Sequence, residues 1–455
     1  MEPFRYHVFA CDQQKPEGVP CCSCHGSAQV IDALRREIAT HGLEDEVQVT
    51  VCGSLGLCEH GPNLIVYPEG IWYSGVKPAD VVEIVESHFQ KDTPVERLVR
   101  TDLAALRAEV LNHRDKMRAA FRAKEAAGAL PDDLNAQIRA FQESRVILTA
   151  LELDVFSAVG NRSSAAEVSA RLKTDPRATE MLLNALAALS LLMKQGNWYR
   201  NSPVAERYFS SASPDCARTA MLHTANLWTT WSNLTNCVRT GAPAPAAADV
   251  GARGDGWIQS FIAAMHRNAS ERAGAVVRTI GAVEVHRMLD VGGGSGAYSI
   301  AFAVANPELA ADILDTAAVA PIAQGHIDKA GVAARVHVHP GDLRTDKLGE
   351  GYDLVFVSAI CHMLSPEENR DLLGRAYAAL APHGRIVVQD FILEPDKTSP
   401  KSATLFALNM LVGTRAGSTY SEPEYAAWLN GAGFRNVKHV RMPGPASLMV
   451  ATRES

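Results

Sequence analysis

Residues 288–296 read Met-Leu-Asp-Val-Gly-Gly-Gly-Ser-Gly and join an apolar strand to a glycine-rich turn. Glycine lets the backbone turn sharply at a strand end without a Cβ clash against a ligand, and the helix that follows offers unpaired N–H donors. The stretch therefore predicts a nucleotide-type pocket. Gly292, Gly294 and Ala297 also satisfy the loose dinucleotide fingerprint, so the motif alone does not separate NAD from other adenosyl cofactors.

The chain from residue 285 onward alternates between apolar strand-like runs and helical segments, which is typical of an α/β fold with a parallel sheet. The last two runs are joined by Pro443-Gly444-Pro445 and lie too close together for a helical crossover, so they predict a closing antiparallel hairpin. We therefore expect a Rossmann-like domain with a seven-stranded sheet. The runs are 285–291, 311–315, 335–338, 352–358, 385–392, 436–442 and 446–452.

Acidic residues at the strand ends favour S-adenosylmethionine over NAD. Asp315 ends the second strand, where it can accept hydrogen bonds from a ribose diol, and Asp342 follows the third strand, where it can meet an adenine. A terminal hairpin is common in S-adenosylmethionine methyltransferases and is not the usual ending of a dehydrogenase domain. The predicted cofactor-binding residues are Asp290, Gly292, Gly294, Gly296, Asp315, Asp342, Leu343 and Ser358.

Residues 140–455 resemble the plant-type and bacterial small-molecule O-methyltransferases, the group of the acetylserotonin, caffeic acid and polyketide enzymes. The resemblance rests on Asp175–Leu186, on Phe261 with Met265, and on Ile360–Glu368. It implies that the histidine of the last motif, His362, is the general base.

The same resemblance implies further site residues. Asp390 falls where an acidic residue orients the histidine, and a second acidic position falls at Thr419, with Glu422 nearby. Met265 and Met410 are the best candidates to line a substrate pocket if their helices close over the site. A base is needed because a neutral hydroxyl is a poor nucleophile, and imidazole titrates near working pH.

The helical segment before the Rossmann-like domain ends in a short run, 192–201, that predicts the hairpin of a winged helix. Few basic residues occur on its would-be recognition helix, so nucleic-acid binding is not expected. In the resembling family this segment intertwines two subunits, which implies a homodimer.

Six of the nine cysteines fall in the first 58 residues. In a cytosolic chain such a cluster favours a metal or redox site over structural disulfides. Strand, helix and hairpin signals in the first 90 residues predict a compact α/β unit.

These residues resemble the thioredoxin-like [2Fe-2S] ferredoxins, in His7–Cys11, Ser23-Cys24, Leu55–Pro62, Val66–Gly70 and Trp72–Val76. Four thiolates hold the cluster in that family. Cys11, Cys24 and Cys58 match three positions, whereas the remaining one falls on Ser54. Cys52 is expected to replace it, and Cys21 and Cys22 are further candidates. Thiolate ligation is the normal chemistry of such clusters, so a serine ligand would be unusual, and a [2Fe-2S] cluster on Cys11, Cys24, Cys52 and Cys58 is the favoured interpretation. A zinc ion on some of the same residues, which four thiolates would satisfy equally well, and a metal-free domain stay open.

Length and composition complete the expectations. A chain of 455 residues with 47% hydrophobic residues and a net charge of −7 is an ordinary globular protein of several domains with no global attraction for nucleic acid. No long apolar run or signal peptide occurs, so a cytoplasmic protein without membrane association is expected. The expected domains are a ferredoxin-like domain (1–92), a helical linker (93–135), a winged-helix dimerisation domain (136–240) and a methyltransferase domain (241–455).

The function that follows is methyl transfer from S-adenosylmethionine to a hydroxyl of a small molecule, coupled to an iron–sulfur domain with a possible redox partner protein. Carbon or nitrogen methylation stays open because one fold serves all three atoms. The alternative from another class is an iron–sulfur electron-transfer or redox-sensing protein with a scaffold methyltransferase domain.

Overall fold

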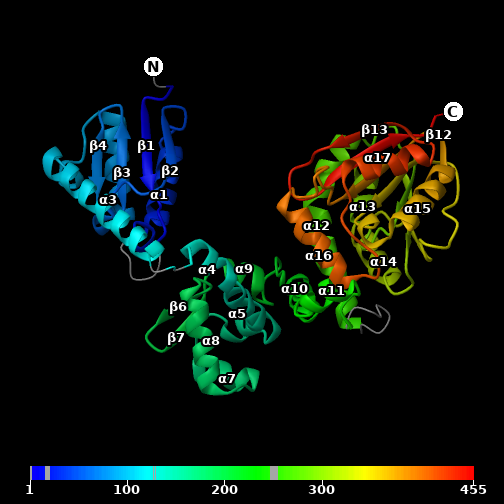
Figure 1. Cartoon of the computed structure of the whole chain (residues 1–455), viewed down its shortest axis with the longest axis horizontal. Coiled ribbons are helices and arrows are strands. Elements are labelled where there is room, and N and C mark those ends of the chain that lie inside the picture. The colour runs from blue at the N-terminus through cyan, green and yellow to red at the C-terminus, as the bar shows by residue number, and fades with distance from the viewer. Residues whose placement is uncertain (1–2, 16–20, 127, 129, 246–254, 455) are drawn as a thin grey trace. The chain divides into compact units, whose positions relative to one another are not determined.

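The computed structural model describes residues 3–15, 21–126, 128, 130–245 and 255–454 (Figure 1). The chain divides into two compact units, Met1–Ala140 and Phe141–Ser455, which are described separately. Among the described helices, none combines the length and the apolar content that a bilayer crossing needs.

The first unit is built on a four-stranded sheet with the order β2-β1-β3-β4. β1 (Tyr6–Cys11) pairs in parallel with β2 (Val47–Cys52) across α1 (Ser27–Thr40), and β3 (Asn63–Tyr67) and β4 (Ile71–Ser74) add an antiparallel hairpin. The buried face of α1 carries Val30, Ile31, Leu34 and Ile38, which recur at helical spacing and pack on the sheet. The compact α/β unit predicted for the first 90 residues is therefore confirmed.

The sequence from Pro78 to Phe89, with Pro near its start, predicts a helix that closes this unit, and the observed helix is irregular. Pro78–Asp80 forms a 3₁₀ turn, α2 covers only Val81–Glu83, and Ile84–Phe89 continues as a π-helix. Its buried side chains, among them His88 and Phe89, complete the core.

The predicted linker helix begins later than expected, because α3 spans Leu103–Ala126 and a 3₁₀ turn occupies Glu96–Leu98. Its first half packs on the preceding part of the first unit: a Cβ on Gly56 would lie 2.9 Å from Cγ1 of Val110, and Glu109 pairs with Arg100 at 2.6 Å. A short helix, α4 (Asp132–Arg139), follows.

The second unit starts with a helical part that contains a small sheet. α7 (Ala165–Leu172) and α8 (Pro176–Ala188) are N-capped by Ser164 and Asp175, whose side chains accept backbone N–H groups. β6 (Leu192–Gln195) and β7 (Trp198–Asn201) form the hairpin predicted at 192–201, and β5 (Ser163–Ser164) adds a third strand. The remaining elements of this part are α5 (Phe141–Glu152), α6 (Val155–Val159) and α9 (Pro203–Phe209).

Three helices lead into the Rossmann-like part: α10 (Arg218–Trp231), α11 (Leu234–Thr240) and α12 (Asp255–Ile280). Residues 243–256 are rich in Pro, Ala and Gly, which predicts a loop, and they lie largely outside the described residues.

The predicted seven-stranded sheet is confirmed, with the order β10-β9-β8-β11-β12-β14-β13. Its first five strands run parallel, and the last two form the expected antiparallel hairpin. The strands are β8 (Arg287–Val291), β9 (Ala310–Asp315), β10 (Val336–Pro340), β11 (Tyr352–Ser358), β12 (Leu380–Asp390), β13 (Arg435–Val440) and β14 (Ser447–Thr452).

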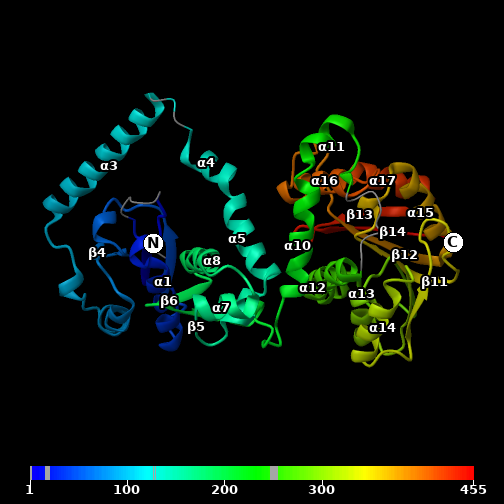
Figure 2. The ribbon, with the colours of Figure 1, turned by 90° about the horizontal axis from the view of Figure 1, so that it is seen from below.

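Helices cover both faces of this sheet (Figure 2). α12, α13 (Ala297–Ala305) and α14 (Ala320–Lys329) pack on one face, and α15 (Pro366–Ala379) and α17 (Glu422–Gly431) pack on the other. α16 (Lys401–Gly413) lies against the turn at Cys361–Met363. In a doubly wound sheet the carboxyl ends of the parallel strands form the ligand-binding edge.

Candidate active site

The glycine-rich turn after β8 has the predicted geometry. Gly292, Gly294 and Gly296 all have positive φ, between 58° and 74°. The N–H of Gly294 donates to Oδ2 of Asp315 at 2.8 Å, so the end of β9 holds the turn in place. Gly293, absent from the predicted site, is equally constrained, since a Cβ there would lie 2.8 Å from the carboxylate of Asp290. The run of three glycines was the signal for it.

Asp290 is fully buried below this turn. Its Oδ2 accepts a hydrogen bond from Ser299 at 2.7 Å, whereas its Oδ1 has no partner among the described residues. Burial raises the pKa of this carboxyl to about 7. A buried carboxylate oxygen without a donor fits a site that receives its partner from a polar ligand.

Asp315 and Asp342 stand at the ends of β9 and β10, as predicted. Burial also raises the pKa of Asp315. Asp342 is exposed and its Oδ1 accepts the N–H of Arg344 at 2.9 Å. Both carboxylates therefore lie at the carboxyl edge of the sheet, beside the glycine turn, where a ribose and an adenine can be bound.

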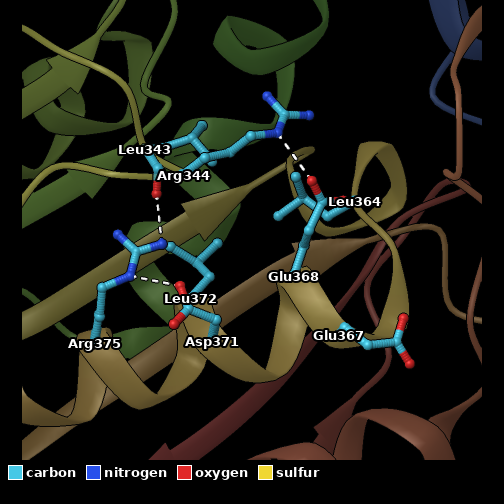
Figure 3. Close-up of a pocket in the computed structure, with 8 residues that line it drawn as sticks. All are labelled: Leu343, Arg344, Leu364, Glu367, Glu368, Asp371, Leu372 and Arg375. Carbon is cyan, nitrogen blue, oxygen red and sulfur yellow. Dashed lines mark hydrogen bonds and ion pairs between the residues drawn. The ribbon is translucent and has the colours of Figure 1, made fainter.

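The loop after Asp342 is fastened to α15, as Figure 3 shows. The guanidinium of Arg375 donates to the carbonyl of Leu343 at 2.8 Å, and Arg344 pairs with Glu368 at 3.2 Å. These contacts border a hollow of about 270 Å³ between the loop and the helix. They position the loop that carries Asp342 and Leu343.

Ser358 ends β11, and its hydroxyl donates to Oε1 of Gln389 at the end of β12 at 3.2 Å. At the next residue the backbone is strained, because Ala359 has a φ of 57°, which residues other than glycine rarely adopt. This bend leads directly into the turn Cys361–Met363 and places His362 at the carboxyl edge of the sheet.

His362 and Asp390 form a buried pair. Nδ1 of His362 lies 2.7 Å from Oδ1 of Asp390, and the side chains are 7% and 1% exposed. The backbone N–H of His362 also donates to Oδ2 of Asp390, at 3.1 Å. A carboxylate on Nδ1 selects the tautomer with its proton there, which leaves Nε2 as the nitrogen that can accept a proton.

Two further groups of residues support this pair. The hydroxyl of Tyr425 donates to Oδ2 of Asp390 at 3.2 Å, and Tyr425 is fully buried on α17. Phe406 meets the His362 ring edge-on at 4.8 Å and stacks on Phe391 at 4.1 Å. The sequence motif around His362 gave no signal for Tyr425, which comes from a distant helix.

The other predicted pocket residues lie on separate elements. Met410 is buried on α16, the helix that carries Phe406, and Met265 is half-buried on α12. Thr419 is buried and donates to the carbonyl of Ala403. Glu422 instead binds Nδ1 of His439 at 2.7 Å, so it does not serve as the second acidic partner of His362.

Comparison with known proteins accounts for this arrangement. A family model for the O-methyltransferase domain matches residues 231–435, and one for the O-methyltransferase dimerisation domain matches residues 136–211. The chain is 31% identical over 314 residues to 3-hydroxy-5-methyl-1-naphthoate 3-O-methyltransferase of Streptomyces sahachiroi, covering 67% of this chain and 90% of that protein. The chain belongs to the S-adenosylmethionine-dependent O-methyltransferase family.

Other O-methyltransferases extend the similarity. The tetracenomycin polyketide synthesis 8-O-methyl transferase of Streptomyces glaucescens is 29% identical, with 71% of this chain and 97% of that protein covered. The crystal structure of human N-acetylserotonin methyltransferase in complex with SAM is 26% identical with a TM-score of 0.63, covering 71% of this chain and 97% of that chain. The two family models leave residues 1–135 outside their matches.

The predicted metal ligands of the first unit are not brought together as a set of four thiolates. Cys24 forms a disulfide with Cys21, and Sγ of Cys58 lies 3.2 Å from Oγ of Ser54. Cys52 lies next to Cys11 in the register of the parallel strands β1 and β2. No group of three or more metal-binding side chains gathers in the part of the chain that the structure describes. The donor set therefore does not fit a [2Fe-2S] cluster on Cys11, Cys24, Cys52 and Cys58.

Proposed function

We propose that this O-methyltransferase transfers the methyl group of S-adenosylmethionine to a hydroxyl of a small aromatic molecule, with His362 as the general base. The buried pair of His362 and Asp390 carries the proposal. The acceptor class is supported by the stacked rings of Phe391 and Phe406 beside His362 and by the naphthoate named for the Streptomyces sahachiroi relative.

S-adenosylmethionine supplies an electrophilic methyl group bound to a sulfonium. The sulfur is a good leaving group once a nucleophile is aligned with the methyl carbon. The glycine turn, Asp290, Asp315, Asp342, Leu343 and Ser358 would hold the cofactor at the carboxyl edge of the sheet. Nε2 of His362 takes the proton of the acceptor hydroxyl, and Asp390 stabilises the imidazolium that results. Met265 and Met410 are proposed to line the acceptor pocket.

The experiment that tests this role compares the wild-type enzyme with His362→Ala. We expect methyl transfer to be lost while S-adenosylmethionine binds with unchanged affinity in calorimetry, since the ring lies at the acceptor and not in the glycine turn. Loss of cofactor binding in the variant would contradict the assignment of His362 as the base.

We further infer that the enzyme is a homodimer, which the dimerisation-domain match over residues 136–211 supports. The topology of the first unit, a βαβ segment followed by a β-hairpin and a helix, supports a thioredoxin-like fold for residues 1–92. The proposed domains remain 1–92, 93–135, 136–240 and 241–455. Coupling to an iron–sulfur cluster and its redox partner is not part of the proposal, because the thiols that it needs are not assembled.

A further inference from the structure

The bonded pair Cys21–Cys24 occupies a particular place in the first unit. It follows β1 and immediately precedes α1, at the crossover of a βαβ segment, with a 3₁₀ turn over Ser23–His25. A Cys-x-x-Cys sequence at such a crossover is typical of dithiol redox sites. The pair is therefore placed for redox chemistry and not for holding two distant segments together.

The two residues of the disulfide differ in their exposure to solvent. Cys24 is exposed, whereas Cys21 is fully buried. The backbone N–H of Cys24 donates to Sγ of Cys21 at 3.1 Å. An external thiolate can therefore reach Cys24, and the sulfur that leaves is the one that already accepts a hydrogen bond, which stabilises its thiolate form.

The other thiols of the unit are less accessible. Cys11, Cys22 and Cys58 are each at most 1% exposed. Asn63 donates to Sγ of Cys22 at 3.4 Å, and Gly61 approaches so closely that a Cβ there would lie 2.7 Å from that sulfur. Cys22 holds the pKa of Cys11 below its usual value, at about 6, through a hydrogen bond. These three thiols are protected from direct exchange and Cys52 is half-buried, so Cys24 carries the most accessible sulfur of the unit.

We propose that Cys21 and Cys24 form a thiol–disulfide exchange site in the N-terminal unit, with low-molecular-weight thiols as the reductant. A thiolate attacks Sγ of Cys24, forming a mixed disulfide and breaking the Cys21–Cys24 bond, whose electron pair passes to Sγ of Cys21. A second thiolate attacks the external sulfur of the mixed disulfide and releases the thiolate of Cys24. One protein disulfide and two thiols thus give one protein dithiol and one external disulfide.

The test uses the full-length protein, purified anaerobically and equilibrated with reduced and oxidised glutathione at a series of ratios. Free thiols are alkylated and the peptides are analysed by mass spectrometry. Cys21 and Cys24 are expected to pass together from unlabelled to labelled, while Cys22, a free thiol on the same peptide, carries a label throughout and is told apart by fragmentation of the peptide. The change is expected to follow a two-electron transition, in which a tenfold change in equilibrium constant corresponds to about 30 mV.

Two variants sharpen the test. Cys24→Ser is expected to leave Cys21 labelled as a free thiol under alkylation of denatured protein and to remove the paired transition. Cys52→Ser, on the neighbouring strand, is expected to retain the transition at the same glutathione ratio. Circular dichroism checks that both variants fold.

Three results would overturn the proposal. The pair would be inert if Cys21 and Cys24 stayed unlabelled at every ratio, and it would not form a disulfide if both were labelled even in oxidised glutathione. Two irons per chain, with thiolate-to-iron bands in the visible spectrum that Cys24→Ser abolishes, would show that these cysteines bind a cluster instead.

Discussion

At the scale of single residues, the chemistry depends on how Asp390 is held. Its carboxylate receives the ring and the backbone N–H of His362, the N–H of Phe391 at 2.8 Å, and the hydroxyl of Tyr425. Four donors fix the carboxylate in one orientation, and the carboxylate in turn fixes the imidazole. Asp390 is thus a positioning residue whose charge stabilises the protonated base.

Replacing Asp390 with Asn tests this role. Asn retains the shape but can donate to Nδ1, which favours the wrong tautomer, so kcat is expected to fall by about 10²- to 10⁴-fold. The affinity for S-adenosylmethionine, measured by calorimetry, should not change. Asp328→Asn, at an exposed position of α14, is the matched control. An undiminished kcat in Asp390→Asn would contradict the pairing.

Asp290 predicts how the stability of the cofactor-free enzyme depends on pH. Its folded pKa, about 7, lies above the ordinary value of 3.8, so the folded protein binds this proton more tightly than the unfolded chain does. The free energy of unfolding should therefore decrease as pH rises from about 4 to about 7, by up to roughly 4 kcal/mol.

Urea denaturation at several pH values measures this change, and Asp290→Asn should flatten it. S-adenosylmethionine binding should weaken in the same variant, because the polar group under the glycine turn is altered. The role of burial at Asp290 would be contradicted if the free energy of unfolding rose between pH 4 and pH 7 by the same amount in the wild-type enzyme and in Asp290→Asn.

At the scale of elements, the turn that carries His362 is held by a close backbone approach. A Cβ on Gly417 would lie 2.3 Å from the carbonyl oxygen of His362 and 3.1 Å from Cα of Met363. Neither neighbour is a flexible side chain end, so the turn would have to move. The packing of the active site therefore requires glycine at position 417, and no sequence motif predicts this.

Gly417→Ala is expected to lower kcat by about 10²-fold, since a displacement of about 1 Å at a catalytic group has effects of that size. The matched control is Gly374→Ala on α15, where a Cβ would meet no atom within 4 Å. That control should keep full activity and gain about 0.5–1 kcal/mol of helix stability. Steady-state kinetics and thermal melting distinguish the two, and equal kcat values would refute the packing argument.

The elements also show what sequence could predict. Strand and helix alternation from residue 285 predicted the sheet because apolar periodicity and the glycine turn are local signals. The disulfide between Cys21 and Cys24 was not predicted, because the Cys-x-x-Cys spacing fits a metal site as well as a dithiol pair. Tyr425 was missed for a different reason: its contact with Asp390 joins two segments distant in sequence.

At the scale of the whole molecule, the question is whether the O-methyltransferase part depends on the N-terminal unit. The relatives are covered over 90% and 97% of their lengths by the part of this chain that they match. The two family models match residues 136–211 and 231–435, so both matched domains lie within residues 136–455. The N-terminal unit has its own hydrophobic core, and residues 1–135 lie outside both models.

Deleting residues 1–135 should therefore leave a protein that binds S-adenosylmethionine with the affinity of the full chain and sediments as a dimer. The reason is that both matched domains remain intact. Analytical ultracentrifugation and calorimetry measure the two properties. An insoluble or monomeric product would show that the first unit is required for assembly.

O-methylation is tested by methyl transfer from labelled S-adenosylmethionine to a panel of hydroxylated aromatic acids, with the methylated atom located by NMR. We predict that the methyl group appears on a hydroxyl oxygen, that acceptors without a free hydroxyl are inert, and that His362→Ala transfers nothing to the same acceptor. A methyl group found on a ring carbon or an amine would contradict O-methylation, and transfer by His362→Ala at the wild-type rate would contradict the role of His362 as the base.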